Sequence, residues 1–173
     1  MRAGLEDAAW RRFYLGFRDP EIARLNGHRP LRMPYWLFKR VVQAELRRGD
    51  RVAYAIYDEA ERFLGVVELY EMAAGEATLG ILITDKARWG QGYGTAAVRA
   101  VLREAFLHHG LKRVKLRTFV WNARARRAFE KAGFRLLRVE PAEGGDEDAV
   151  MAIEREAWLK TMGAAGHPGQ APR

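Results

Sequence analysis

The chain has 173 residues and a mass of 19.7 kDa, which suits one domain at about 150 residues per domain. Hydrophobic residues make up 49% and aromatic residues 11%, shares that exclude a disordered or fibrous chain. Cysteine is absent, so disulfides, thiolate metal sites and cysteine nucleophiles are excluded. The net charge of +8 predicts attraction to anions such as nucleic acid, acidic lipid or a phosphate-rich cofactor.

A biased composition is the competing explanation for this charge, because arginine far outnumbers lysine while asparagine and glutamine are scarce. Scarce amides and missing cysteine are also typical of thermophiles. No apolar run approaches the ~18 residues of a membrane span, and the N-terminus has no apolar stretch typical of a secretory signal. We therefore expect a cytoplasmic protein without a membrane partner.

The N-terminal part is predicted to be helical. Apolar side chains recur at i, i+3, i+4 and i+7 over residues 5–18, which indicates an amphipathic helix. A short helix, a loop and a longer helix are expected at 19–25, 26–33 and 34–48.

The hydrophobic period then changes to two, which is typical of strands. Three strands, expected at 51–57, 63–72 and 77–84, form a predicted antiparallel meander.

Helices and strands alternate in the C-terminal half. The spacing predicts helices at 90–109 and 122–132 and strands at 114–120, 134–139 and 149–154. An acidic loop is expected at 141–148. Residues 163–173 have the composition of a flexible tail, which leaves 1–162 as a single domain.

A glycine-rich segment, Gly90-Gln91-Gly92-Tyr93-Gly94, lies between the third strand and the helix that follows it. Glycines let the backbone approach a ligand closely, and the free N–H groups of a first helical turn carry partial positive charge. The segment therefore predicts a site for a phosphate or pyrophosphate, with a glycine-rich turn that binds nothing as the alternative.

Three cofactors could use such a site. A P-loop needs Gly-Lys-Ser/Thr, and Gly94-Thr95-Ala96 has no lysine. A Rossmann site needs an acidic residue about 20 residues further on, and none stands there. Coenzyme A remains, because it carries a pyrophosphate and a pantetheine arm that can lie along a strand edge.

Two segments resemble the Gcn5-related N-acetyltransferase (GNAT) family. Residues 90–94 resemble its motif A, and residues 122–134, with Asn122 and Ala128-Phe129-Glu130-Lys131-Ala132-Gly133-Phe134, resemble its motif B. The resemblance is clearest over 77–140. Trp89 and the four residues after it are typical of the branch that acetylates ribosomal-protein N-termini and small amines such as polyamines.

The resemblance implies an α/β GNAT acyl-CoA N-acyltransferase fold, with a mostly antiparallel sheet splayed between its fourth and fifth strands and flanked by helices. It implies transfer of acetyl from acetyl-CoA to a primary amine by direct attack in a ternary complex. The cofactor-binding residues that it implies are Leu82, Ile83, Thr84, Gly90, Gln91, Gly92, Tyr93, Gly94, Thr95 and Asn122. Four basic residues of the motif B helix either meet the 3′-phosphate or form a solvated face: Arg124, Arg126, Arg127 and Lys131.

The sequence departs from the family at two positions. Phe129 stands where a motif B tyrosine often protonates the leaving thiolate, and Arg117 stands where some members have a glutamate. We therefore consider Glu68, in the second strand, and His28, in the loop between the first helices, as replacement catalytic groups. The alternative for both is an exposed structural position. No His, Asp and Glu cluster has the spacing of metal ligands, so no metal is expected.

An enzyme without a strong base should favour amines of low pKa. At pH 7, deprotonation costs about 1.4 kcal/mol for an α-amine and about 4.6 kcal/mol for a lysine. We therefore favour a protein N-terminal α-amine as acceptor, with a polyamine, aminoglycoside or amino sugar as the alternative. A non-catalytic module that binds coenzyme A or RNA is a further alternative, although nucleic acid is not the expected partner. A homodimer remains open.

Overall fold

A computed structural model describes residues 2–3 and 5–165 of the chain. The helices are α1 (Asp7–Arg18), α2 (Pro20–Leu25), α3 (Tyr35–Leu46), α4 (Tyr93–Arg103), α5 (Ala123–Ala132) and α6 (Arg155–Ala165). Shorter helical turns are η1 (Lys86–Arg88), η2 (Glu104–His108) and η3 (Glu143–Gly145). The strands are β1 (Arg2–Ala3), β2 (Val52–Tyr57), β3 (Phe63–Ala73), β4 (Glu76–Ile83), β5 (Arg113–Phe119), β6 (Arg135–Pro141) and β7 (Glu147–Glu154).

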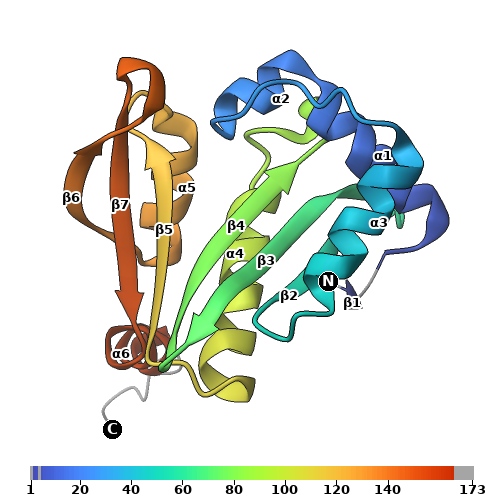
Figure 1. Ribbon diagram of the computed structural model, residues 1–173. Helices are drawn as coiled ribbons and strands as arrows, with labels where there is room; N and C mark the ends of the chain where they lie inside the picture. The colour runs from blue at the N-terminus through green and yellow to red at the C-terminus, as the bar shows by residue number, and fades with distance from the viewer. Residues whose placement is uncertain (1, 4, 166–173) are drawn as a thin grey trace, which may run out of the picture.

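In the described part of the chain, seven strands form one sheet in the order β1-β2-β3-β4-β5-β7-β6. Neighbouring strands are antiparallel except β4 and β5, which run parallel. These two strands pair only between 76–78 and 113–115, and then they diverge into an open V (Figure 1). The predicted fold class, including the splay between the fourth and fifth strands, is confirmed.

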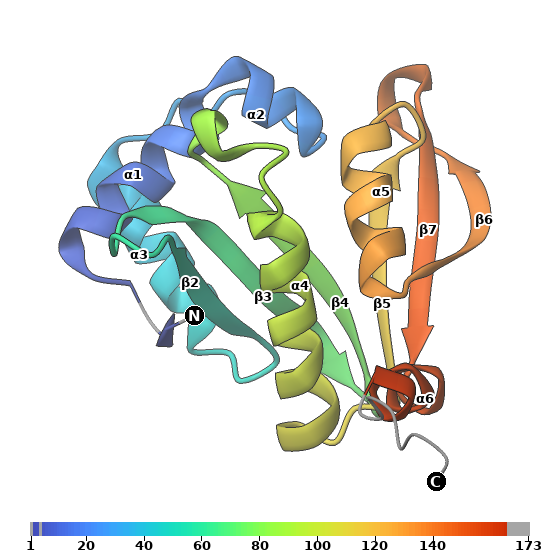
Figure 2. The ribbon, with the colours of Figure 1, turned by 180° about the vertical axis from the view of Figure 1, so that it is seen from behind.

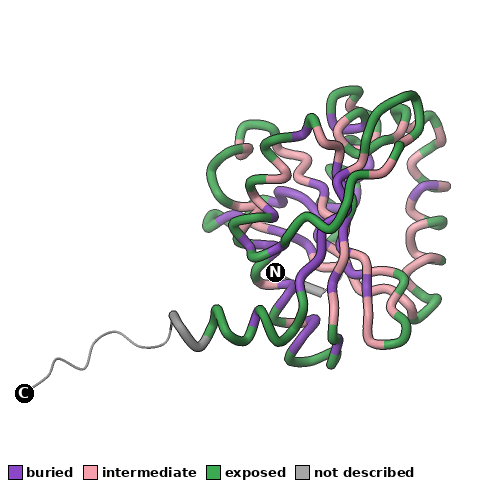
Figure 3. Tube along the Cα trace, turned by 90° about the vertical axis from the view of Figure 1, so that its left-hand side faces the viewer, coloured by how far each residue is buried: buried purple, intermediate pink, exposed green. Residues whose placement is uncertain are grey.

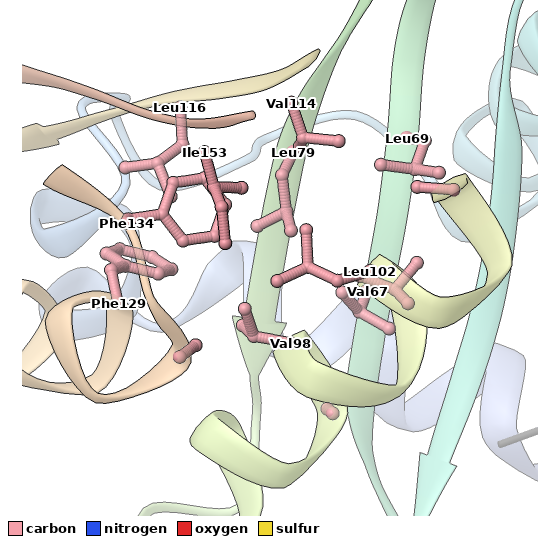
Figure 4. Close-up of a cluster of buried hydrophobic side chains, with 14 of the residues drawn as sticks. Val67, Leu69, Leu79, Val98, Leu102, Val114, Leu116, Phe129, Phe134 and Ile153 are labelled. Carbon is pink, nitrogen blue, oxygen red and sulfur yellow. The ribbon is translucent and has the colours of Figure 1, made fainter. Parts of the chain in front are cut away.

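Helices cover both faces of this sheet. One face carries α1 and α3, and the opposite face carries α4 and α5, which flank the V (Figures 1 and 2). The main core lies between the sheet and these two helices (Figure 4). It contains side chains from β3, β4, β5 and both helices, among them Val67, Leu79, Val98, Leu116 and Phe129.

A second, aromatic cluster fixes α1 and α3 on the other face. Trp10, Phe13 and Phe38 are buried there, with ring centroids 5.6–6.4 Å apart. Burial is concentrated in the sheet and on the inner sides of the helices, whereas most of α6 is exposed (Figure 3). Within residues 2–3 and 5–165, no helix combines the length and apolar character that crossing a membrane requires.

Four element predictions needed correction. The short strand β1 and the helix α6 were not expected, and α6 packs through Trp158, whose ring lies 5.4 Å from that of Phe106. The helix predicted from 90 begins only at Tyr93, because the glycines before it form a turn, and it ends in a π-helical turn over 104–108. The predicted tail boundary at 163 falls inside α6, and 166–173 lie outside the described residues.

Candidate functional site

A cavity of about 690 Å³ occupies the V between β4 and β5. Leu79 and Leu116 belong to the core under α4, so Gly80 and Arg117, which alternate with them, face the opposite side of the sheet. Because Leu79, Gly80 and Arg117 all line the cavity, it reaches from the α4–α5 face through the V to the α1–α3 face. We call the second end, lined by Tyr70, Arg117, Glu143 and Asp148, the far end of the cavity.

The edge of β4 exposes main-chain groups to this cavity. The Thr84 N–H donates to the Leu64 carbonyl at 2.7 Å, which places the amides of Thr84 and Leu82 toward β3. The alternate residues Ile81 and Ile83 therefore direct their amides into the V, beyond the last pair formed with β5. An extended, amide-bearing chain could hydrogen-bond this edge as an added strand would.

The glycine-rich turn forms one wall of the cavity. Gly90 and Gly92 have φ values of +78° and +92°, which side chains rarely tolerate. The turn leads directly into α4, whose first N–H groups have no partner within the helix. These donors and the positive end of α4 suit a pyrophosphate. Gly94 and Thr95 also line the cavity.

Gln91 and Tyr93 belong to the same segment but do not line the cavity. The Gln91 amide donates to the Ala87 carbonyl at 2.7 Å, and the Tyr93 hydroxyl donates to Glu59 Oε2 at 2.6 Å. Their side chains anchor the turn from outside, so any contact with a ligand is left to their backbone.

Three of the four basic residues suggested for a phosphate line the cavity: Arg124, Arg127 and Lys131. Arg126 does not, because its guanidinium bonds the Val120 carbonyl at 3.3 Å and pairs with Glu130 at 3.9 Å. Burial lowers the pKa of Arg124, and the nearby Glu21 opposes this shift.

Trp89 joins the two sides of the V. Its indole N–H donates to the Ile83 carbonyl at 3.1 Å, and the Arg124 guanidinium lies 3.8 Å from the centre of its ring. Arg88, next in the chain, lines the cavity and donates to Asp58 Oδ2 at 3.0 Å. The turn and α5 are thus in contact across the cavity.

Asn122 and Phe129 line the cavity from the motif B segment. Asn122 is buried and caps α5, since its Oδ1 accepts from the Ala125 N–H at 3.2 Å. Phe129 is buried against Phe134, with ring centroids 6.0 Å apart, and provides no hydroxyl.

The far end of the cavity carries one cation, Arg117, and more than one carboxylate. The Arg117 guanidinium donates to Glu140 at 2.7 Å and lies 3.7 Å from Asp148. Glu143 and Asp148 add carboxylates, and Tyr70 reaches this end from β3.

Glu68, one of two suggested catalytic groups, lies beside the cavity rather than in its wall. It lines a smaller cavity of about 260 Å³ under α1 and α3, where it pairs with Arg51 at 3.1 Å. Burial is the main cause that raises the pKa of Glu68, and Arg51 opposes the rise. Its Oε1 would lie 3.1 Å from a Cβ on Gly80.

His28, the other suggested group, also stands outside the cavity wall. Its ring stacks on Phe17 with centroids 5.3 Å apart, and Nδ1 lies 2.9 Å from the Arg29 carbonyl. A carbonyl only accepts, so Nδ1 carries the proton. Nε2 is buried with no hydrogen-bond partner among the described residues. This position supports packing of the loop more than proton transfer.

The cavity residues that were missed from the sequence include Tyr70, Ile81 and Arg88. Leu79, Ile81 and Ile83 alternate along one strand, and this spacing could have placed Ile81 in the cavity together with Ile83. No sequence signal identifies Tyr70, because its place depends on the register of β3 against β4.

The cavity fits acetyl-CoA. The open edge of β4 can pair with the amides of the pantetheine arm, the start of α4 suits the pyrophosphate, and the basic side chains of α5 suit the remaining phosphate. The fit rests on the main-chain donors and on the three basic side chains of α5 that line the cavity, Arg124, Arg127 and Lys131.

Comparison with known proteins agrees with this fit. Residues 4–135 match the family model described as Acetyltransferase (GNAT) domain. A spermidine N-acetyltransferase from Vibrio cholerae, in complex with CoA and spermine, superimposes with a TM-score of 0.83 at 19% identity over 91% of this chain and 96% of that one. The spermidine/spermine N-acetyltransferase SpeG from Vibrio cholerae, in complex with manganese ions, gives a TM-score of 0.74 at 18% identity over 92% and 94%.

The family match covers most of the chain, and the cavity supplies what the family's cosubstrate requires. The earlier resemblance is therefore confirmed, and the chain belongs to the GNAT family as an acetyl-CoA-dependent N-acetyltransferase.

Proposed function

We propose that this enzyme acetylates a primary amine of low pKa, and first the N-terminal α-amine of a protein or peptide. The observation that carries the proposal is the set of titratable groups at the far end of the cavity: Tyr70, Arg117, Glu143 and Asp148. None of these residues is a histidine, the side chain that most often accepts a proton near neutral pH. An acceptor must therefore lose its proton with little help, which costs about 1.4 kcal/mol for an α-amine and about 4.6 kcal/mol for a lysine.

The described residues act mainly by binding and orientation. The edge of β4 and the first turn of α4 hold the cosubstrate, while α5 supplies cations for its phosphates. Bound acetyl-CoA supplies an activated thioester carbonyl, and an N–H of the β4 edge can stabilise negative charge that develops on its oxygen. No protein thiol can carry the acetyl group, because the chain has no cysteine. This favours direct transfer within a ternary complex, in which proximity supplies much of the rate.

The test compares two peptides of equal charge at pH 7 and pH 9, with thiol release as the readout. One peptide has a free α-amine and no lysine, and the other has a blocked α-amine and one lysine. Between these pH values the neutral fraction rises about sevenfold for the α-amine and about a hundredfold for the lysine. We expect the α-amine peptide to react much faster at pH 7 and the ratio of rates to narrow at pH 9. Comparable rates at pH 7 would contradict the proposal.

A polyamine is the second candidate, and the carboxylates at the far end of the cavity favour it. Glu143 and Asp148 could each hold a second ammonium group of a small cationic acceptor. The structural neighbours named above are spermidine N-acetyltransferases, which agrees with this candidate. The variant Glu143→Gln separates the two: a raised KM for spermidine with an unchanged KM for the α-amine peptide would favour the polyamine.

A further inference from the structure

Tyr70 brings a phenolic hydroxyl into the cavity where motif B does not. Among the described residues that line the larger cavity, Tyr70 is the one tyrosine. Phe129 lines the same cavity from α5 but has only a buried ring in contact with the core. The cavity therefore has one phenolic O–H group, and it comes from β3 instead of α5.

The packing around Tyr70 keeps its ring beside the edge of β4. Its Cε1 lies 3.4 Å from the position that a Cβ would take on Gly80, so the ring lies against β4 at van der Waals distance. The Arg51 guanidinium lies 5.2 Å from the centroid of the ring. Across the described residues, no group hydrogen-bonds the Tyr70 hydroxyl. The hydroxyl is thus positioned by its ring and is free to donate to a ligand.

The charges around Tyr70 keep the hydroxyl protonated. Burial raises its pKa most, and the nearby carboxylates Glu71 and Glu68 raise it further. Arg51 and Arg117 act in the opposite direction without reversing the shift. At the pH where an amine acceptor reacts, Tyr70 is therefore a hydrogen-bond donor.

We propose that Tyr70 donates its proton to the sulfur of coenzyme A during acetyl transfer, in the role that the tyrosine replaced by Phe129 would have. As the carbon–sulfur bond breaks, sulfur keeps the electron pair and takes the Tyr70 proton. As the carbon–nitrogen bond forms, the acceptor nitrogen loses one proton, which returns to the Tyr70 oxygen directly or through water. Protons and electrons balance, and no other reagent is consumed.

The variant Tyr70→Phe tests this role, because it removes the hydroxyl and keeps the ring that contacts Arg51. Tyr54→Phe is the matched control, since Tyr54 lies on β2 and its hydroxyl faces His109 at 3.4 Å, outside the larger cavity. Proton donation contributes about 10²–10⁴-fold in other enzymes, so we expect kcat to fall about a hundredfold in Tyr70→Phe with the KM for acetyl-CoA unchanged. Tyr54→Phe should match the wild type.

A second readout does not depend on turnover or on the acceptor. A donor near sulfur favours the thiolate over the thiol, so the pKa of enzyme-bound coenzyme A thiol should be lower in the wild type than in Tyr70→Phe. Titration of the thiolate absorbance of the bound coenzyme measures this, and we expect a shift of about one unit. Adding Phe129→Tyr to Tyr70→Phe should restore part of kcat.

Coincident titrations for the wild type and Tyr70→Phe would overturn the proposal, and so would a kcat within twofold of the wild type. A failure of the α-amine preference would leave the titration unaffected. The result for Tyr70 is therefore independent of which amine is the acceptor.

Discussion

The same substitution to alanine should change the thermal stability of the protein in opposite directions at two glycines of one motif, Gly92 and Gly94. Gly92 is left-handed, with φ at +92°, whereas Gly94 lies inside α4 with helical backbone. No described atom lies within 4 Å of a Cβ built on either residue, so conformation alone decides the effect on stability. Gly92→Ala should cost about 1–2 kcal/mol, which lowers Tm by roughly 2–8 °C for a domain of this size. Gly94→Ala should keep or raise Tm, because alanine favours a helix.

Binding of coenzyme A should weaken in both variants, although for different reasons. Gly92→Ala distorts the turn that leads the free N–H groups of α4 toward the ligand. Gly94→Ala leaves the turn intact but places a methyl group in the cavity wall, where a pyrophosphate would approach the backbone. Thermal unfolding gives the first quantity, and calorimetric titration with coenzyme A gives the second.

The combination separates folding from binding. A stable Gly94→Ala with an unchanged Kd for coenzyme A would refute the assignment of the pyrophosphate to this turn. A Gly92→Ala variant as stable as the wild type would refute the conformational argument.

Three further predictions concern residues around the cavity. Arg124→Ala should raise the KM for acetyl-CoA about tenfold, since a cation lining the cavity is lost, as initial rates would show. Gly16→Ala should destabilise the protein by about 1–3 kcal/mol in urea unfolding, because its Cβ would lie 2.3 Å from the Thr84 methyl group. Burial raises the pKa of Glu68 in the folded protein. The stability that the protonated Glu68 contributes is therefore lost as pH rises from about 4, the usual pKa, through the raised pKa. Over that pH range, the urea midpoint of Glu68→Gln should increase relative to that of the wild type.

Two of these predictions have a matched control variant, and the third is checked by a comparison between two pH values. Arg126 lies on the same helix as Arg124 but is bonded to Val120 and Glu130, so Arg126→Ala should leave the KM for acetyl-CoA unchanged. If Arg126→Ala raised this KM as much as Arg124→Ala does, the cause would be the loss of one positive charge from the helix and not a contact made by Arg124. Thr84→Ser removes the methyl group that Gly16→Ala would meet and should recover stability in the double variant. For Glu68→Gln, a stability difference that is the same at pH 4 and pH 7 would contradict the raised pKa.

Local sequence patterns determined most of the fold. Strand alternation over 51–57 and 77–84 and helical spacing over 5–18 matched β2, β4 and α1 because each pattern reflects burial on one face of one element. Helix α6 was missed, since its packing depends on Trp158 meeting Phe106 from a distant helix. The glycine turn was recognised because left-handed residues and a helix start leave a composition signal.

The turn before α4 could be predicted from local sequence, because it depends on glycine conformation and on residue spacing within a short segment. The family and the cosubstrate came instead from the resemblance of residues 90–94 and 122–134 to two family motifs. Which groups face the V depends on long-range pairing and packing. Register places the free amides at Ile81 and Ile83 instead of Leu82 and Thr84, and a bond to Val120 turns Arg126 away while Arg124 reaches Trp89. Tyr70 lies beside Gly80 for the same reason: pairing between β3 and β4 is a long-range contact, and no local pattern in the sequence records which residues it brings together.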